Sequence, residues 1–243
     1  ENVKVLYVIP DYQNPSGRTW SLARRRAFME VINHFRLPVV EDAPYTELCF
    51  EGEPLPSLKS MDSGGLVIYL GTFSKILFPG VRIGWLVADQ PLYEKYILVK
   101  QGADLHTSTL SQRQVWAFMQ EYSIEENVSR MLPVYRRRRD VMLEAIETFF
   151  PEGVTYSRPH GGLFFWVVLP AACDARELLR RSVERKVAFV PGGSFFPNGG
   201  HENTMRLNFS AMSEEKIRVG IERLAGVIRE FLAECCPTTG SSA

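Results

Sequence analysis

Residues 66–85 read LVIYLGTFSKILFPGVRIGW, and the rest of the chain is interpreted outward from this stretch. The apolar run at 66–70 predicts a buried strand, which passes directly into residues 71–75 (GTFSK), three of which are polar. After a Pro-Gly turn, the run at 81–88 predicts another strand. Two hydroxyls, one amine and one guanidinium therefore come from one strand end and its loop, a combination that suits a phosphate group and a reactive amine.

The polar groups of this stretch are Lys75, Arg82 and the hydroxyls of Thr72 and Ser74. A lysine amine forms a Schiff base with an aldehyde only when it is deprotonated, and a partly desolvated site near other cations favours that form. Hydroxyls and a guanidinium, which is a planar fork of donors, suit phosphate. Taken alone, a Ser-Lys pair in a loop is more often a solvated charge, so both interpretations stay open at this point.

Upstream of this stretch, strand and helix patterns alternate. Residues 3–9 predict a strand that stops at a proline, the turn cluster 11–17 (DYQNPSG) follows, and 22–34 predict a helix. Residues 38–42 predict a short strand that ends in a carboxylate. Because strands that alternate with helices form largely parallel sheets, the sequence predicts an α/β fold with polar side chains at the strand ends.

Downstream, a helical region precedes a smaller α+β unit. The helical patterns cover 92–101, 111–121 and a long stretch from 124 to 149; later strands are expected at 162–169, 187–190 and 205–209, and later helices at 175–185 and 213–234. The four arginines at 136–139 suit phosphate, but their acidic neighbours favour a solvated helix face.

The composition is that of an ordinary folded protein. The 243 residues carry 28 Lys and Arg against 28 Asp and Glu, and 45% are hydrophobic, so disorder is excluded for most of the chain. The zero net charge gives no electrostatic footprint for nucleic acid or an anionic membrane. The longest apolar run, around 163–172, is shorter than the roughly 20 residues that a membrane helix needs. We therefore expect neither partner for this segment.

The spacing of the cysteines and histidines predicts no metal site. The four cysteines and four histidines match neither a ligand spacing nor a disulfide framework. Free thiols favour a reducing compartment, so we expect a cytoplasmic protein without a metal.

Four separated motifs occur in the order in which one enzyme family carries them. They are Asn14-Pro15-Ser16-Gly17, Asp42 with Tyr45, Thr72-x-Ser74-Lys75 with Arg82, and Arg206 in Met205-Arg206-Leu207-Asn208-Phe209. Each is weak alone, but the ordered set resembles the fold-type I pyridoxal-phosphate-dependent aminotransferases of class I/II over nearly all of residues 3–234. The resemblance implies a mostly parallel large-domain sheet with helices and a smaller C-terminal α+β domain.

The resemblance assigns a cofactor, pyridoxal 5'-phosphate, to side chains around Lys75. Lys75 is implied to form the Schiff base and then to move a proton between the substrate's α-carbon and the cofactor. Asp42 is implied to pair with the pyridinium nitrogen, and Asn14 and Tyr45 to hydrogen-bond the phenolic oxygen. The implied phosphate ligands are Thr72, Ser74 and Arg82. Without the resemblance, Asp42 is typical of a turn or helix cap and Tyr45 of a surface aromatic.

Arg206 is the candidate substrate ligand. The resemblance implies that its guanidinium, on a strand of the smaller unit, holds the substrate α-carboxylate through two hydrogen bonds, with Asn14 also at the substrate. Without the resemblance, a surface arginine on a strand is the preferred interpretation.

Residues 9–17 and 104–112 look most like the 2-aminoadipate and kynurenine-type branch of the family. The implied reaction transfers an amino group between an α-amino acid and a 2-oxo acid. The same residues resemble the aminotransferase-like half of MocR-type transcription regulators, so a cofactor-binding effector domain without turnover is the alternative. β-Elimination and decarboxylation on the same scaffold stay open, as does the side-chain specificity.

The resemblance further implies that the chain is N-terminally truncated relative to the family. Residues 1–125 are expected to be the C-terminal part of the cofactor-binding large domain, 126–236 the small domain, and 237–243 a disordered tail. Family members are dimers whose sites use residues of both subunits, so a homodimer is expected. Part of the phosphate site and an aromatic that stacks on the cofactor ring are expected upstream, so the chain by itself is expected to be inactive.

Overall fold

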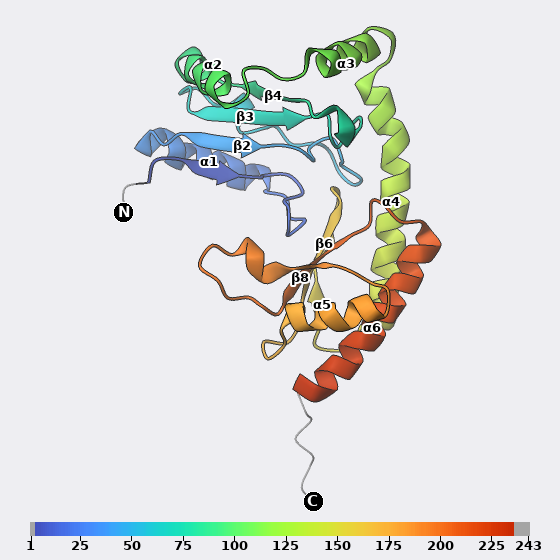
Figure 1. The fold of residues 1–243 in the computed structure, drawn as a ribbon. Coiled ribbons are helices and arrows are strands. Elements are labelled where there is room, and N and C mark those ends of the chain that lie inside the picture. The colour runs from blue at the N-terminus through green and yellow to red at the C-terminus, as the bar shows by residue number, and fades with distance from the viewer. Residues whose placement is uncertain (1–2, 236–243) are drawn as a thin grey trace, which may run out of the picture. The chain divides into compact units, whose positions relative to one another are not determined.

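The computed structural model describes residues 3–235 (Figure 1). Contacts within the chain form two compact units. Unit 1 comprises the described residues up to Gln13 together with Arg18–Leu132, and unit 2 comprises Asn14–Gly17 together with the described residues from Pro133 onward. The short segment Asn14–Gly17 thus belongs to a different unit from the residues on either side of it.

Unit 1 is built on a mixed sheet. In the order in which they pair, its strands are β1 (Leu6–Val8), β2 (Val39–Asp42), β3 (Val67–Thr72) and β4 (Gly84–Val87). β1, β2 and β3 are parallel, and β4 is antiparallel to β3. The predicted α/β fold with a mostly parallel sheet is confirmed. β4 begins at Gly84 instead of residue 81, because Pro79–Val81 forms a short 3-10 helix.

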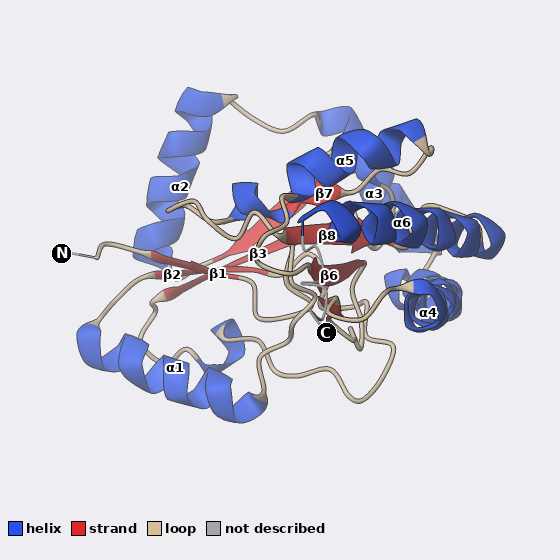
Figure 2. Cartoon of the chain, turned by 90° about the horizontal axis from the view of Figure 1, so that it is seen from below, coloured by secondary structure: helices blue, strands red, loops and turns tan. Residues whose placement is uncertain are grey.

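The helices described in unit 1 are α1 (Leu22–Phe35), α2 (Gln90–Ala103), α3 (Thr109–Glu121) and the beginning of α4 (Ile124–Phe149). α1 begins after Ser21, whose hydroxyl accepts a hydrogen bond from a backbone N–H of the first turn. Met29 and Ile32 of α1 pack with Val39 and Val67 of the sheet. α1 therefore covers one side of the sheet (Figure 2).

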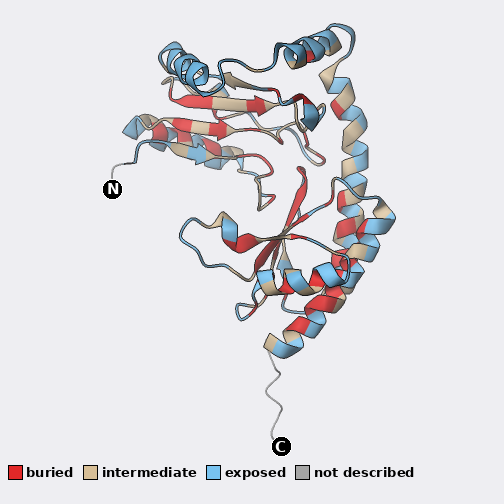
Figure 3. Ribbon diagram, in the orientation of Figure 1, coloured by how far each residue is buried: buried red, intermediate tan, exposed pale blue. Residues whose placement is uncertain are grey.

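Most residues of α2 and α3 are exposed (Figure 3), and several of them are large and apolar. No residue of α2 is buried, and Leu98 and Val99 are 62% and 67% exposed. In α3, Val115 is buried, whereas Leu110 and Trp116 are 69% and 55% exposed. Exposed apolar surfaces of this kind are typical of regions that bind another polypeptide.

Unit 2 contains an antiparallel sheet with the strand order β5 (Thr155–Tyr156), β6 (Phe164–Val168), β8 (Thr204–Asn208) and β7 (Val190–Pro191). Its helices are α5 (Ala175–Glu184), α6 (Glu214–Cys235) and the second part of α4. In the core, the buried rings of Phe165 and Phe209 meet edge to face, with centroids 5.7 Å apart. The smaller α+β architecture agrees with the prediction. β5 was not predicted, because a two-residue strand leaves no periodic signal.

The structure corrects the predicted exposure of the four arginines in α4. Arg136 and Arg137 are exposed, as a solvated helix face requires, but Arg139 is only 4% exposed. Its guanidinium donates to the Pro159 carbonyl and pairs with Asp140. Consecutive helical residues point about 100° apart, so four in a row cannot all face solvent.

Two predictions about domain organisation stay predictions. The contact units change inside α4, between Leu132 and Pro133, and the predicted boundary after residue 125 also falls inside this helix. The predicted disordered tail at 237–243 lies outside the described residues.

Candidate active site

The loop after β3 is shaped by a close contact with β4. Gly71 pairs with Trp85 across the two strands, and a Cβ on Gly71 would lie 2.2 Å from the nearest indole atom. The ring of Phe73 packs on the same indole, with centroids 4.8 Å apart. Glycine is therefore required at position 71, so that the indole can lie against the backbone of β3.

Thr72, Ser74 and Arg82 lie together at this strand end. The Thr72 hydroxyl accepts a hydrogen bond from the Ser74 N–H (3.1 Å) and donates to the Ile83 carbonyl (3.3 Å). Arg82 Nη1 lies 3.5 Å from the Ser74 hydroxyl oxygen and also donates to the Pro79 carbonyl (3.1 Å). Two hydroxyls and an exposed guanidinium thus converge, as a phosphate site requires.

Lys75 is on a single turn that is held from two sides. The Leu77 N–H donates to the Phe73 carbonyl (2.9 Å), and the side-chain amide of Asn127, in α4, donates to the Ile76 carbonyl (2.7 Å). Ile76 is buried and Lys75 is half-buried. No hydrogen bond or ion pair joins the Lys75 ammonium to the residues that the structure describes. The amine is therefore carried on ordered backbone and is available to a ligand.

Asp42 ends β2 at the same edge of the sheet. It pairs with Leu70 of the parallel strand β3, so the carboxyl ends of these strands meet. The Tyr7 hydroxyl, from β1, donates to Asp42 Oδ2. Burial, and then the hydrogen bond to Asp42 and its charge, raise the pKa of Tyr7 above its ordinary value; Tyr45 adds to the same shift. Tyr45 is 5% exposed, which contradicts its interpretation as a surface aromatic.

In unit 2 the structure brings Asn14 and Arg206 together. Arg206 lies on β8, and its Nη1 donates to Asn14 Oδ1 (2.6 Å). The guanidinium carbon is 4.4 Å from the ring centroid of Phe164 and 5.5 Å from that of Phe195. A guanidinium is attracted to aromatic faces at these distances. Arg206 is therefore a half-buried, oriented side chain and not a surface arginine.

The segment Asn14–Gly17 contacts the backbone of unit 2 closely. The Asn14–Pro15 peptide bond is cis. Gly17 has a φ of +67°, and a Cβ there would lie 2.7 Å from the Phe164 carbonyl oxygen. Only glycine combines this conformation with this close approach, which accounts for the last residue of the motif.

Unit 1 also buries acidic groups near the site. Arg25 is fully buried and forms an ion pair with Asp11. Glu41 is 0% exposed and accepts hydrogen bonds from the backbone N–H groups of residues 58 and 59, both at 2.8 Å. Burial raises the pKa of Glu41, while the two N–H groups and the charge of Arg25 oppose part of that shift. These interactions anchor the segment after β2, which carries Tyr45.

The predicted site residues fall into three groups: Thr72, Ser74 and Arg82 with Lys75 on the next turn; Asp42 with Tyr45; and Asn14 with Arg206. The first two groups belong to unit 1 and the third to unit 2. Their roles toward a cofactor or substrate stay predictions.

Three supporting residues were not predicted: Tyr7, Asn127 and Phe195. Tyr7 carried one usable signal, since it lies in a strand predicted to precede the Asp42 strand in the same sheet. Asn127 and Phe195 carried none, because no local pattern links them to Ile76 and Arg206.

Residues 3–235 contain neither a metal-binding cluster nor a helix suited to crossing a membrane. No group of His, Cys, Asp and Glu side chains in this range could hold a metal ion. No helix in the described part of the chain is long and apolar enough to cross a membrane.

Comparison with known families gives a match over most of the chain. The family model for aminotransferases of class I and II matches residues 2–224. An aromatic-amino-acid aminotransferase of Thermococcus litoralis is 44% identical over 230 residues, which are 95% of this chain and 55% of that protein. The 2-aminoadipate transaminase of Thermus thermophilus is 42% identical over 236 residues, which are 96% of this chain and 59% of that protein.

A solved structure agrees with these matches. The kynurenine aminotransferase of Pyrococcus horikoshii, crystallised with PMP and with KYN as substrate, superposes with a TM-score of 0.92 at 44% identity. The match covers 95% of this chain and 57% of that one. The chain therefore spans less than two thirds of the length of each of these relatives.

Proposed function

Because the chain belongs to the class I and II aminotransferase family, we propose that the protein transfers an amino group between an α-amino acid and a 2-oxo acid, with pyridoxal 5'-phosphate as its cofactor. The observation that carries this proposal is the end of β3, where Thr72, Ser74 and Arg82 converge and Lys75 follows on the next turn. This strand end offers both phosphate donors and an amine, and few other functions need the two together.

The donor set of unit 1 fits this cofactor. Pyridoxal phosphate supplies an aldehyde and a ring that accepts electrons. Arg82 and the hydroxyls of Thr72 and Ser74 would hold its phosphate, and the Lys75 amine would link covalently to its aldehyde as a Schiff base. Asp42 would accept a hydrogen bond from the protonated ring nitrogen, and the hydrogen bond that Tyr7 donates to Asp42 would orient the carboxylate.

Lys75 is the proposed acid–base residue. When it is not linked to the cofactor, its amine would take a proton from the α-carbon of the amino acid, which requires an uncommitted side chain at a fixed position. Both conditions are supported by the turn held between Phe73, Leu77 and Asn127 and by the lack of a competing partner among the described residues.

Arg206 and Asn14 are the proposed carboxylate ligands. The guanidinium offers two parallel N–H donors to a carboxylate, and Asn14 Oδ1 orients it through the 2.6 Å hydrogen bond. The rings of Phe164 and Phe195 lie against the guanidinium and keep water from it. A charge-assisted hydrogen bond is stronger where water is excluded.

Chemical trapping tests the assignment of Lys75. After incubation with excess pyridoxal phosphate, reduction with borohydride and peptide mapping are expected to find the label at Lys75. Lys75→Ala is expected to remove the label and the visible imine absorbance, whereas Lys95→Ala, on the exposed surface of α2, changes neither. A label that persists at equal occupancy on another lysine in Lys75→Ala would overturn the assignment.

Turnover, measured on the chain extended by the N-terminal half that the resemblance implies, separates the proposed enzyme from its alternatives. Aromatic amino acids, kynurenine and 2-aminoadipate are the donors to test with a 2-oxo acid, because the relatives carry those names. An effector domain of a transcription regulator would bind the cofactor without product formation, and β-elimination or decarboxylation would release ammonia or carbon dioxide. The enzyme is better supported, since the family match and these relatives are aminotransferases.

The proposal extends to assembly and location: a homodimer in the cytoplasm. The exposed apolar side chains of α2 and α3 favour association with a second copy. The free cysteines described, Cys49, Cys173 and Cys235, fit a reducing compartment. Light scattering on the purified protein tests whether it is a homodimer, and a monomer at micromolar concentration would contradict this proposal.

A further inference from the structure

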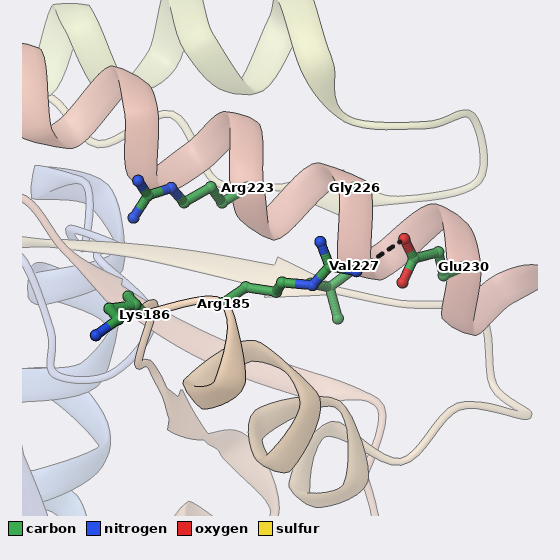
Figure 4. A pocket seen from close by; sticks show the side chains of 6 residues that line it. All are labelled: Arg185, Lys186, Arg223, Gly226, Val227 and Glu230. Carbon is green, nitrogen blue, oxygen red and sulfur yellow. Dashed lines mark ion pairs between the residues drawn. The ribbon is translucent and has the colours of Figure 1, made fainter.

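An open cavity of about 380 Å³ lies in unit 2, where the end of α5 faces α6 (Figure 4). The lining residues are Arg185, Lys186, Arg223, Gly226, Val227 and Glu230. The first two follow the last turn of α5, and the others belong to α6. The proposed aminotransferase reaction uses none of them.

The cavity carries more positive than negative charge. Arg185 and Glu230 form an ion pair at 3.6 Å. Lys186 and Arg223 form no ion pair or hydrogen bond with the residues that the structure describes, so their charges are uncompensated. Figure 4 shows both of these side chains extending to the side of the cavity away from Glu230.

This lack of partners is unusual for an arginine of unit 2. The carboxylate pairs elsewhere in the unit include Arg137 with Glu214, Arg158 with Glu147, Arg176 with Glu202, Arg180 with Glu177, Arg181 with Glu234 and Arg218 with Glu144. Among the arginines described in unit 2, only Arg136 and Arg223 have no such contact and no hydrogen bond to the protein. Arg136 is exposed on α4, whereas Arg223 lines a cavity.

Gly226 is a second, independent observation. Glycine is unfavourable inside a helix, and a Cβ at position 226 would meet no atom within 4 Å. Packing therefore does not explain this glycine, but a side chain there would reduce the open space of the cavity. Beside it, Val227 is 3% exposed and provides an apolar wall.

We propose that this cavity binds a small organic oxyanion, a phosphate or a carboxylate. Arg223 supplies the planar fork of donors and Lys186 a further charged donor, while the wall at Gly226 and Val227 accommodates an apolar part of the ligand. The volume lies within the range of small-molecule sites and exceeds what one oxyanion group needs.

Calorimetric titration of the chain with phenyl phosphate, benzoate and inorganic phosphate tests the proposal. Saturable millimolar binding of phenyl phosphate or benzoate is expected, with inorganic phosphate weaker because it lacks an apolar part. Arg223→Gln and Lys186→Asn are each expected to weaken binding roughly 10-fold or more. Asparagine tolerates the left-handed conformation of residue 186 (φ 63°). Arg136→Gln is the matched control and is expected to leave the affinity unchanged.

Filling the cavity gives a test that does not change charge. Gly226→Leu is expected to abolish binding, and Gly220→Leu to leave it intact. Gly220 is the matched control, because it is also in α6 with no atom near its Cβ position but does not line the cavity. Circular dichroism verifies that both variants are folded. If Gly226→Leu does not fold, the affinity of Arg223→Gln tests whether the cavity binds the anion.

The predicted cofactor-phosphate site is a second place where these anions could bind. Arg82→Gln disables that site and is expected to leave the titration of the cavity unchanged. Three results would each overturn the proposal: no saturable binding of any probe, equal loss in the Arg136→Gln or Gly220→Leu control, or loss of all binding in Arg82→Gln. None of these results would contradict the aminotransferase assignment, and the last would support a phosphate site at Arg82.

Discussion

Gly71 is the residue on which the shape of the cofactor-side loop depends most directly. In Gly71→Ala, the new Cβ would lie 2.2–2.5 Å from three atoms of the Trp85 indole, a rigid ring that also packs on Phe73. We expect a loss of about 1–3 kcal/mol in the free energy of unfolding, measured by urea denaturation. Gly80→Ala is the control, because its nearest contact is an ordinary 3.6 Å, and it is expected to stay within about 0.5 kcal/mol.

Arg206 tests the carboxylate site of the proposed enzyme. In the chain extended by the N-terminal half that the resemblance implies, Arg206→Ala is expected to weaken binding of the amino acid by about 1.5–3 kcal/mol, because a charge-assisted hydrogen bond is lost. The absorbance of bound cofactor is expected to stay largely unchanged, since Lys75, Asp42 and the proposed phosphate ligands belong to unit 1; of the proposed cofactor ligands, only Asn14 belongs to unit 2. KM values and spectral titration measure the two effects. Unchanged kinetics toward every α-amino acid tested would show that Arg206 has no role in substrate binding.

At the scale of elements, β2 presents two neighbouring carboxylates to different surroundings. Successive side chains of a strand point to opposite faces. Glu41 is therefore buried, whereas Asp42 accepts a hydrogen bond from Tyr7. The pattern at 38–42 predicted the strand and its terminal carboxylate. It could not predict that Glu41 caps the backbone of residues 58 and 59, because nothing local links those positions.

Glu41 makes stability depend on pH. Burial raises its pKa above the ordinary 4.5, so the folded protein binds this proton more tightly than the unfolded chain. The stabilisation is fully present below the unfolded pKa and is lost as the pH rises through the raised pKa. Glu41→Gln removes this dependence. As the pH rises across that window, the free energy of unfolding of the wild type is therefore expected to fall relative to that of Glu41→Gln.

Asp62 provides the control of opposite sign. Burial would raise its pKa, but backbone N–H groups of residues 66 and 67 and the charge of Lys59 outweigh burial and lower it. Its stabilisation is present above the unfolded pKa and lost as the pH falls. Urea denaturation over a pH series is expected to give wild-type-minus-variant slopes of opposite sign for Glu41→Gln and Asp62→Asn. Equal slopes would contradict the assignment of Glu41.

At the scale of the whole molecule, the chain of residues 1–243 by itself is expected to show little cofactor occupancy and no turnover. Arg82 is exposed and Lys75 only half-buried, so a cofactor linked there would be open to water. The chain also covers only 55–59% of the length of the enzymes it resembles. Titration with micromolar pyridoxal phosphate measures occupancy. Stoichiometric binding together with turnover of any amino-acid and oxo-acid pair would contradict this expectation.

The amino-acid sequence alone predicted the α/β class, most of the element order and the residues that converge at the strand ends, but not β5. Periodicity and turn residues are local properties, and the ordered motifs ending in Lys75 and Arg206 carry the family resemblance. Strand ends and the exposure of Arg139 were less predictable, because tertiary packing decides where a pattern stops.

The residues that support the site became identifiable only in the folded structure. Tyr7 donates to Asp42, Asn127 holds the turn of Lys75, and Phe195 lies against Arg206. Tyr7 and Asp42 are 35 residues apart in the sequence, and Asn127 is 51 residues from Ile76, whose carbonyl it binds. Asn14 and Arg206 are 192 residues apart. Such contacts leave no periodic signal, because they arise only when the folded backbone brings distant segments into register.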